Sequence, residues 1–376
     1  MTTHPSRTRV FGRLVGGGLD NQQDTEFSLE PQTISIMKII RPLAVHSAMI
    51  ARPFLAYCLV FLLISPIASA QDRTGGRRVR GNAAGVQYAP AVPIPTLTNV
   101  RYGEHPRNVV DFWKAEAQTP TPLVFVIHGG GWVGGSKERV DRFADVDALL
   151  KAGISVAAIN YRYTSQADVS DNDPPVKTPL HDAARALQFV RSKSGEWNLD
   201  KERVGAAGGS AGACSSLWLA FHDDLADAES DDPISQESTR LWCAAVTGAQ
   251  TTLDPQQMKT WTPNSKYGGH AFGKKSFAEF LDQREHILPW LAEYSPYALV
   301  SHDDPPVYLI YSAPPAIGQN QKDPTHTSNF GVKLKEHCQD VGTDCELVYP
   351  GAPSARHKTP TEFLISTLSA PSESRQ

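Results

Sequence analysis

The sequence has little cysteine, little methionine and no large excess of charge of either sign. Its 376 residues include 5 cysteines and 4 methionines, and the formal net charge is −4. A protein that neutralises nucleic-acid phosphates needs clustered lysine and arginine, so nucleic acid is not an expected partner. Hydrophobic residues make up 40% and charged residues 20%. This composition is ordinary for a globular protein and excludes collagen-like, coiled-coil, disordered and polytopic membrane chains.

The cysteines lack the spacing of a metal-ligand set, and neither a metal nor an organic cofactor is expected. Cys338 and Cys345 flank a short connection between an expected helix and an expected strand, so they form one candidate disulfide. Cys214 and Cys243 are interpreted as small buried apolar residues, because free cysteine is frequently interior.

One apolar run stands near the N-terminus, at residues 54–64, which read FLAYCLVFLLI. The run follows basic residues and precedes Ala68-Ser69-Ala70, and it is too short to span a bilayer. This order is typical of a secretory signal peptide. We expect residues 1–70 to be cleaved off after Ala70 and the true translation start to lie downstream of residue 1. The product would be an exported protein without membrane attachment. The alternative is an uncleaved signal anchor.

Apolar strands and helices alternate after an Arg-, Gly- and Pro-rich stretch at 71–96, which is expected to be a linker. The expected strands are 100–102, 109–113, 123–127, 154–159, 204–207, 244–249, 307–311 and 346–349, and the expected helices include 137–152, 180–193 and 328–338. Strands apolar on both faces and separated by helices form a parallel sheet covered on both sides. The predicted fold class is therefore α/β, in one domain over residues 97–370 with a tail at 371–376. The first two strands are expected to be antiparallel.

Two segments are longer than this alternation requires. The acidic stretch 222–240 is interpreted as a solvated loop, because it lacks the regular ligand spacing and the glycine of a calcium loop. The segment 250–302 is rich in aromatic residues and is expected to form a small cap over a pocket, the alternative being core packing. Trp261 in this segment, together with Trp132, is a candidate for the pocket wall.

A serine stands between glycines where a strand passes into a helix. The motif Gly208-Gly209-Ser210-Ala211-Gly212 follows the expected strand 204–207. A serine on such a sharp turn exposes its hydroxyl at the carboxyl edge of the sheet, next to a helix N-terminus that favours negative charge. Ser210 is therefore the candidate nucleophile.

A second glycine motif, His128-Gly129-Gly130-Gly131-Trp132, follows the expected strand 123–127. Consecutive glycines let backbone amides approach a ligand, which suits an oxyanion hole completed by the amide after the nucleophile. We assign Gly129, Gly130 and Ala211 as its donors. His128 is interpreted as a residue that orders this loop.

The acid and the base are expected after the nucleophile in the chain. Asp323 follows the expected strand 307–311 and is the candidate acid, with Asp340 and Asp344 as substitutes. His357 follows the last expected strand and is the candidate base. A local hydrogen bond between His326 and Asp323 is also compatible with their spacing.

These motifs, with Asn160-Tyr161-Arg162-Tyr163, Asp182 and the later YPGA, resemble the α/β-hydrolase serine esterases. The similarity is to the hormone-sensitive-lipase-like group and to the bacterial feruloyl and acetylxylan esterase-like (BD-FAE-like) group. It extends over residues 100–368 and implies an eight-stranded, mostly parallel sheet and an acyl-enzyme formed on Ser210. Gly209 stands where many lipase-like relatives have an acidic residue, which favours the feruloyl and acetylxylan branch.

Together with the expected signal peptide, the resemblance indicates an exported carboxylesterase acting on short or aromatic acyl esters, with acetyl or feruloyl esters of carbohydrates as small-molecule or polysaccharide substrates. Three alternatives share the fold: a lipase, a small serine peptidase and a catalytically silent binding module.

Overall fold

The computed structural model describes residues 87–168, 172–353 and 355–370. All of the described residues belong to the unit formed by residues 76–376. The expected signal peptide, most of the expected linker and the tail at 371–376 therefore lie outside the described residues. No helix among the described residues is long and apolar enough to cross a membrane.

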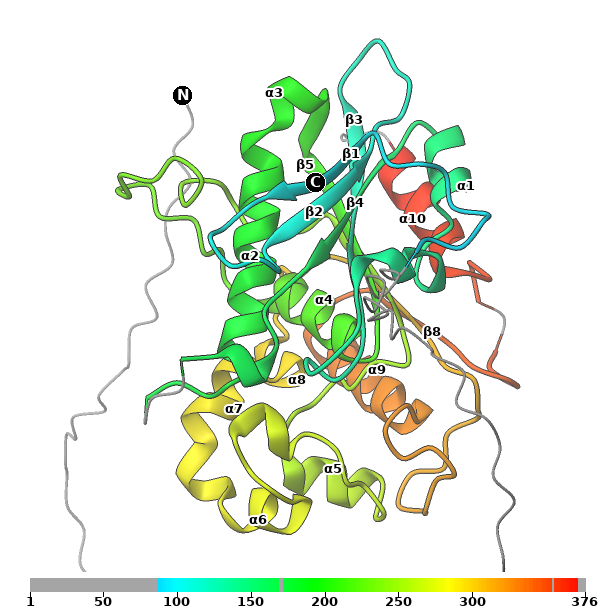
Figure 1. The fold of residues 1–376 in the computed structure, drawn as a ribbon. Coiled ribbons are helices and arrows are strands. Elements are labelled where there is room, and N and C mark those ends of the chain that lie inside the picture. Colours follow the sequence, from blue (N-terminus) through cyan, green and yellow to red (C-terminus); the bar gives the residue numbers. More distant parts are fainter. Residues whose placement is uncertain (1–86, 169–171, 354, 371–376) are drawn as a thin grey trace, which may run out of the picture. The chain divides into compact units, whose positions relative to one another are not determined.

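The described domain is built on an eight-stranded sheet (Figure 1) with the order β1-β2-β4-β3-β5-β6-β7-β8. The strands are β1 (Leu97–Arg101), β2 (Val109–Trp113), β3 (Thr121–Ile127), β4 (Ser155–Asn160), β5 (Leu199–Gly209), β6 (Cys243–Thr247), β7 (Val307–Ile310) and β8 (Cys345–Val348). β1 and β2 are antiparallel to their neighbours, and the remaining pairs are parallel. The predicted α/β class and antiparallel start are confirmed.

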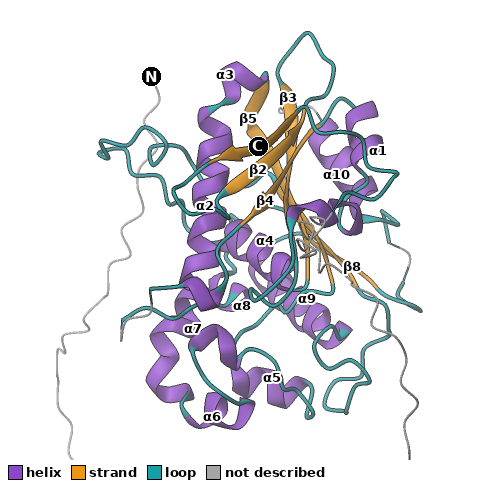
Figure 2. Ribbon diagram, viewed as in Figure 1, coloured by secondary structure: helices purple, strands orange, loops and turns teal. Residues whose placement is uncertain are grey.

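Helices cover both faces of this sheet (Figure 2). They are α1 (Val146–Lys151), α2 (Lys177–Ser192), α3 (Ser194–Trp197), α4 (Ala211–Phe221), α5 (Pro255–Trp261), α6 (Phe277–Asp282), α7 (Leu288–Tyr294), α8 (Pro296–Leu299), α9 (Ser328–Val341) and α10 (Pro360–Ser369), with 3-10 turns η1 (Lys137–Arg142), η2 (Thr164–Gln166), η3 (Gly269–Phe272) and η4 (Arg284–Ile287). Buried side chains form one core that includes α2, α4 and α9 and another that includes α1 and α10. The central strands are apolar on both faces because each face meets one of these cores.

Two predicted segments differ from the structure. The expected helix 137–152 is divided into η1 and α1, because Asp145 caps α1 by accepting a hydrogen bond from the Ala148 amide at 3.0 Å. The segment 250–302 forms the small helical group α5 to α8, grouped at one end of the domain (Figure 1). Its aromatic side chains mostly join the core.

The candidate disulfide is not formed in the structure. Cys338 lies in the last turn of α9 beside Cys345, and both are buried free thiols. The hydrogen bond that the Cys345 thiol donates to Cys338 raises the pKa of Cys345, and burial raises it further. Cys214 and Cys243 are also buried and form no disulfide, as expected for small apolar residues.

Candidate active site

The carboxyl ends of four neighbouring strands surround one cavity. Ile127 at the end of β3 pairs with Gly208 of β5, and Gly209 pairs with Thr247 of β6. The cavity has a volume of about 1020 Å³. Its lining consists of Arg107, His128, Gly129, Gly130, Gly135, Ser136, Arg139, Arg142, Phe143, Tyr163, Gly209, Ser210, Thr247, Gly248, Ile310, Tyr311, Ser312, Asp323 and His326. This is the edge at which parallel sheets bind ligands, since the loops there leave the strands toward opposite faces.

Ser210 occupies the sharp turn between β5 and α4, as the sequence predicts. Its φ of 53° and ψ of −123° are strained for a side chain with a Cβ. The Ser210 amide donates to the Thr247 carbonyl at 3.0 Å. A Cβ on Gly208 would lie 2.5 Å from the Gly212 oxygen, and one on Gly212 would lie 2.1 Å from the Ile127 oxygen. Glycine at 208 therefore lets the turn close against Gly212, and glycine at 212 lets α4 pack closely against the end of β3.

The second glycine of this motif makes room for an aromatic ring. A Cβ at Gly209 would lie 2.4 Å from Cε1 of Phe143. Phe143 follows η1 and lines the same cavity. Because the ring occupies the space that a side chain would need, packing against Phe143 requires glycine at position 209.

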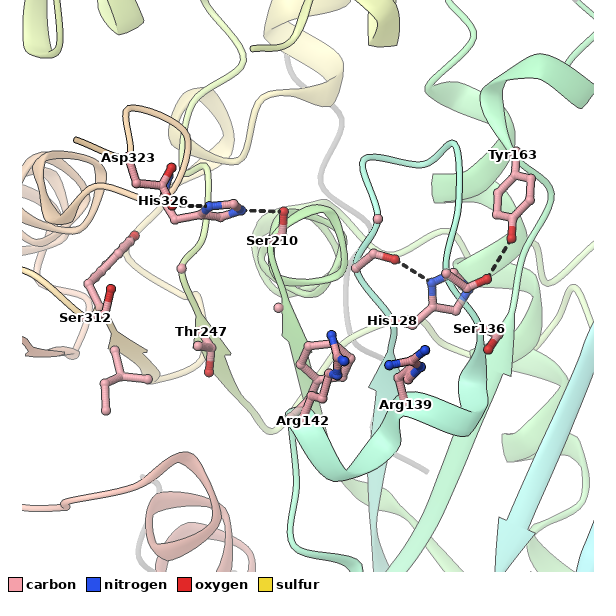
Figure 3. Close-up of a pocket in the computed structure, with 18 of the residues that line it drawn as sticks. His128, Ser136, Arg139, Arg142, Tyr163, Ser210, Thr247, Ser312, Asp323 and His326 are labelled. Carbon is pink, nitrogen blue, oxygen red and sulfur yellow. Dashed lines mark hydrogen bonds and ion pairs between the residues drawn. The ribbon is translucent and has the colours of Figure 1, made fainter. Parts of the chain in front are cut away.

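His326 is the histidine that contacts Ser210 (Figure 3). The Ser210 hydroxyl lies 2.9 Å from Nε2 of His326, and Nδ1 of the same ring lies 2.8 Å from Oδ2 of Asp323. With the proton on Nδ1 facing the carboxylate, Nε2 can accept the hydroxyl proton. Burial alone would raise the pKa of Asp323, but the hydrogen bonds from His326 outweigh it and hold that pKa below its ordinary value.

Asp323 and His326 belong to one connection, between β7 and α9. Oδ1 of Asp323 accepts hydrogen bonds from the amides of Thr325 and His326, at 3.1 and 3.2 Å. This turn places the ring three residues later against the other carboxylate oxygen. The spacing Asp-x-x-His is the sequence signal for this pair. Sequence analysis did not assign His326 as the base, because the base was expected after the last strand.

The structure does not bring His357 to Ser210, and this assignment is corrected. Nδ1 of His357 lies 2.8 Å from Oε2 of Glu346, and its amide donates to Oε1 at 2.7 Å. The turn after β8 folds the chain back along that strand, where the ring also meets Phe363 edge-on at 5.4 Å. Glu346 is only 5% exposed. His357 therefore partners a buried carboxylate outside the lining of the cavity.

The connection that carries Asp323 and His326 is fastened to the segment 250–302. The buried Gln250 donates from Nε2 to the Thr325 carbonyl at 2.7 Å. Asn264 exchanges two hydrogen bonds with the backbone of Gln321, at 2.8 and 3.0 Å. These contacts hold the loop on both sides of Asp323. The segment 250–302 therefore holds the catalytic loop by hydrogen bonds and supplies none of the lining residues named above.

The expected oxyanion-hole residues lie around Ser210. A Cβ on Gly129 would lie 2.6 Å from the Gly209 oxygen and 3.4 Å from Cβ of Ser210. Gly130 has a φ of +114°, which favours glycine. Ala211 is the first residue of α4, where an amide has no acceptor within the helix. The glycine loop can therefore approach the nucleophile closely, and the assignment of these amides remains a prediction.

His128 orders the glycine loop, as interpreted from the sequence. Its Nδ1 lies 2.7 Å from the Gly129 oxygen, and Arg107 contacts its Nε2 at 3.3 Å. The ring stacks on Tyr161 with centroids 4.3 Å apart. Burial lowers the pKa of His128 to about 4. The ring is therefore neutral near pH 7, with Nδ1 donating to the loop.

Neither tryptophan proposed for the pocket wall lines the cavity. Trp132 is fully buried, and its indole donates to the Ser215 hydroxyl at 3.0 Å. This bond ties the glycine loop to α4. Trp261 is buried against Tyr297 and Phe330. Both are core residues, and the lining instead includes Tyr163, Phe143 and three arginines, which sequence patterning did not select.

The described residues contain no group of three or more His, Cys, Asp or Glu side chains arranged to hold a metal ion. The chemistry available at the cavity is that of a serine hydroxyl hydrogen-bonded to a histidine and an aspartate. This arrangement supports nucleophilic catalysis.

Comparisons with known proteins found esterases among the similar sequences and structures. The probable isoprenylcysteine alpha-carbonyl methylesterase of Oryza sativa subsp. japonica is 32% identical over 118 residues, which are 31% of this chain and 26% of that protein. The chain thus spans about a quarter of that relative's length. A truncated carbohydrate esterase from gut microbiota has a TM-score of 0.53 at 19% identity, covering 70% of this chain and 90% of that one.

An acetyl ester-xyloside bifunctional hydrolase from Caldicellulosiruptor lactoaceticus has a TM-score of 0.50 at 22% identity, covering 73% of this chain and 90% of that one. These two likenesses establish the α/β-hydrolase fold. The sequence matches BD-FAE over residues 111–322, which include both glycine motifs and end just before Asp323. The chain therefore belongs to the BD-FAE family.

Proposed function

We propose that this protein is a serine carboxylesterase that cleaves short-chain or aromatic acyl esters through Ser210, His326 and Asp323. One observation carries the proposal: the hydrogen-bonded series from Asp323 through His326 to the Ser210 hydroxyl opens into the cavity. Membership of the BD-FAE family and the similarity to a plant methylesterase support ester substrates.

In the first half of the reaction, Oγ of Ser210 attacks the ester carbonyl carbon while Nε2 of His326 accepts the hydroxyl proton. Asp323 holds the ring in the correct tautomer and stabilises the imidazolium that forms. The carbonyl oxygen becomes an oxyanion, which the amides of Gly129, Gly130 and Ala211 stabilise. The tetrahedral intermediate then expels the alcohol, which takes the proton from His326 and leaves an acyl-enzyme.

In the second half, His326 removes a proton from water, and the resulting hydroxide attacks the acyl-enzyme carbonyl. Collapse of this second intermediate releases the carboxylic acid and returns the proton to Ser210. Both halves use the same base, so a single correctly placed imidazole is sufficient. The 2.9 Å separation between Ser210 and His326 is within the range for such a transfer.

The substrate class we propose is an acetyl or feruloyl ester of a carbohydrate. Two proteins with this fold are described as a carbohydrate esterase and as an acetyl ester-xyloside hydrolase. A fold alone does not determine a substrate, so this choice is one for assay. We also propose export, supported by the apolar run at 54–64 and the small residues ending at Ala70. N-terminal sequencing of the protein recovered outside the cytoplasm tests it.

The deciding experiment measures initial rates on 4-nitrophenyl acetate, butyrate and laurate, on methyl ferulate and on acetylated xylan, with Ser210→Ala as the control. Hydrolysis of acetyl or feruloyl esters that disappears in the variant supports the proposal. Preference for laurate would favour a lipase. No Ser210-dependent hydrolysis of any ester would refute esterase function and leave a peptidase or a silent binding module.

A further inference from the structure

Three arginines line the active-site cavity, and we call Arg107, Arg139 and Arg142 the arginine cluster. Arg139 and Arg142 come from η1, and Arg107 comes from the turn before β2. Figure 3 shows the Arg139 and Arg142 side chains on one side of the cavity, between the labelled Ser210 and His128. Among the lining residues only Asp323 is a carboxylate, and it is already hydrogen-bonded to His326.

The two η1 arginines differ from the lysine in the same segment. The buried Lys137 is neutralised by Asp111 and Glu138, each at 2.8 Å. Within the described ranges, no carboxylate lies at ion-pair distance from Arg139 or Arg142, and neither guanidinium makes a side-chain hydrogen bond. Both side chains are exposed on the cavity side of η1. Their charges are therefore available to a ligand.

The third arginine is held in place by neutral groups. Nε of Arg107 donates to the Tyr161 carbonyl at 2.7 Å, and its guanidinium lies 3.8 Å from the centroid of the Tyr163 ring. A further bond reaches the Gly135 carbonyl at 3.2 Å. These contacts fix the side chain without cancelling its charge. Arg107 therefore adds a pre-positioned positive charge to the cavity.

The cluster contrasts with the rest of the molecule. The chain as a whole has a net charge of −4, yet three cations and one carboxylate line this cavity. Asp141 and Asp145 lie beside Arg142 in an adjoining hollow, and Asp145 is engaged in capping α1. Like charges around a concave surface repel one another and focus a positive potential inside it. An anionic ligand group relieves that repulsion, and a guanidinium matches a carboxylate with two parallel hydrogen bonds.

We propose that the ester substrate carries an anionic group, a carboxylate in the first instance, which the arginine cluster binds while Ser210 attacks the ester. The proposal rests on the proposed esterase function and specifies its substrate. The cavity of about 1020 Å³ is large enough for a group well beyond a short acyl chain. The anion can belong to the acyl part or to the alcohol part, and matched substrates separate the two.

The test compares each carboxylate with its neutral carboxamide in a pH-stat assay at pH 7.5. The acyl arm uses monoethyl glutarate against ethyl glutaramate, and the alcohol arm uses acetoxyacetate against acetoxyacetamide. We expect the carboxylate to exceed the carboxamide at least tenfold in kcat/KM in one arm, which identifies the part that carries the charge. Because the guanidiniums are exposed, the preference is expected to weaken as salt is added.

Variants assign the preference to the cluster. Arg139→Gln/Arg142→Gln is expected to reduce the carboxylate-to-carboxamide ratio at least tenfold, equivalent to about 1.4 kcal/mol. Arg139→Lys/Arg142→Lys, which keeps the charge, is expected to retain part of it. The matched control Lys266→Gln/Lys275→Gln removes two exposed lysines outside the lining and is expected to leave the ratio unchanged. Thermal unfolding of each variant checks folding.

Two results would overturn the proposal: a ratio of one or less in both arms, or a ratio that the Arg139→Gln/Arg142→Gln change does not alter. Failure of the esterase function itself is recognised separately, by absence of Ser210-dependent hydrolysis of the neutral esters. In that case, calorimetric titration of the Ser210→Ala protein with glutarate and glutaramide still tests the subsite. Equal affinity for the two would refute it.

Discussion

The choice of His326 over His357 gives the sharpest prediction. Replacing His326 with alanine removes the group 2.9 Å from the Ser210 hydroxyl. Loss of the base from a triad lowers kcat by about 10⁴ or more, because its members act as a unit. At about 1.36 kcal/mol per tenfold, this corresponds to about 5 kcal/mol of lost transition-state stabilisation. The fold should be retained, since the His326 side chain is 39% exposed.

His357→Ala is expected to show the opposite pattern. It removes the ring hydrogen bond to Glu346, which is 5% exposed, and leaves the amide bond and Arg356, whose Nε lies 3.3 Å from Oε2. Removing a hydrogen-bond donor from a buried carboxylate lowers the free energy of unfolding by about 1–3 kcal/mol. We expect a lower melting temperature with kcat/KM on 4-nitrophenyl acetate within about twofold of wild type, since His357 does not touch the reacting atoms.

Steady-state kinetics and thermal unfolding of both variants decide between the two histidines. The reasoning is refuted if His357→Ala folds normally but loses activity by several orders of magnitude, or if His326→Ala keeps wild-type turnover. Combining the changes adds a check, because distant and independent sites give additive effects. The double variant should therefore combine the activity loss of one with the stability loss of the other.

Three further predictions follow from the packing around the site. Burial lowers the pKa of His128 to about 4 from 6.5, so the unfolded state binds a proton before the folded state does as the pH falls. The free energy of unfolding should therefore decrease by about 3 kcal/mol between pH 7 and 4. Denaturant titrations should show a weaker pH dependence in the His128→Gln variant. Gly209→Ala should destabilise the fold by about 1–3 kcal/mol by forcing a Cβ against Phe143, and Phe143→Leu in the same chain should recover part of the loss in thermal unfolding. A thiol reagent should not react in the native protein with the four buried cysteines, Cys214, Cys243, Cys338 and Cys345. After denaturation without reductant all four should react, and two that remain unreactive would show a disulfide.

Much of the fold could be predicted because hydrophobic patterning reports burial directly. Strands such as β3 and β4 are apolar on both faces, which is possible only when both faces are covered. The nucleophile could also be predicted, because a serine between glycines where a strand passes into a helix is a short, recognisable motif. Both inferences use information contained within a few neighbouring residues.

The base and the pocket walls could not be assigned this way, because they depend on where separate loops fold back. His357 follows the last strand as expected, but the following turn directs it to Glu346 rather than to the cavity. Trp132 and Trp261 are large and apolar, and both are buried in the core instead of lining the cavity. Arg139 and Arg142 line the cavity from a 3-10 turn that is kinked at Arg139, which helical periodicity did not show.

The placement of Asp323 and His326 on a single connection has a consequence for how this site can change over time. Their mutual geometry is set within one turn, which Gln250 and Asn264 hold in place from the segment 250–302. In the function proposed above, the connection between β8 and α10 carries no catalytic residue. With the proposed triad, insertions, deletions and substitutions in the β8–α10 connection would be selected only for stability or substrate contact, whereas changes at Gln250 or Asn264 would reach the catalytic loop.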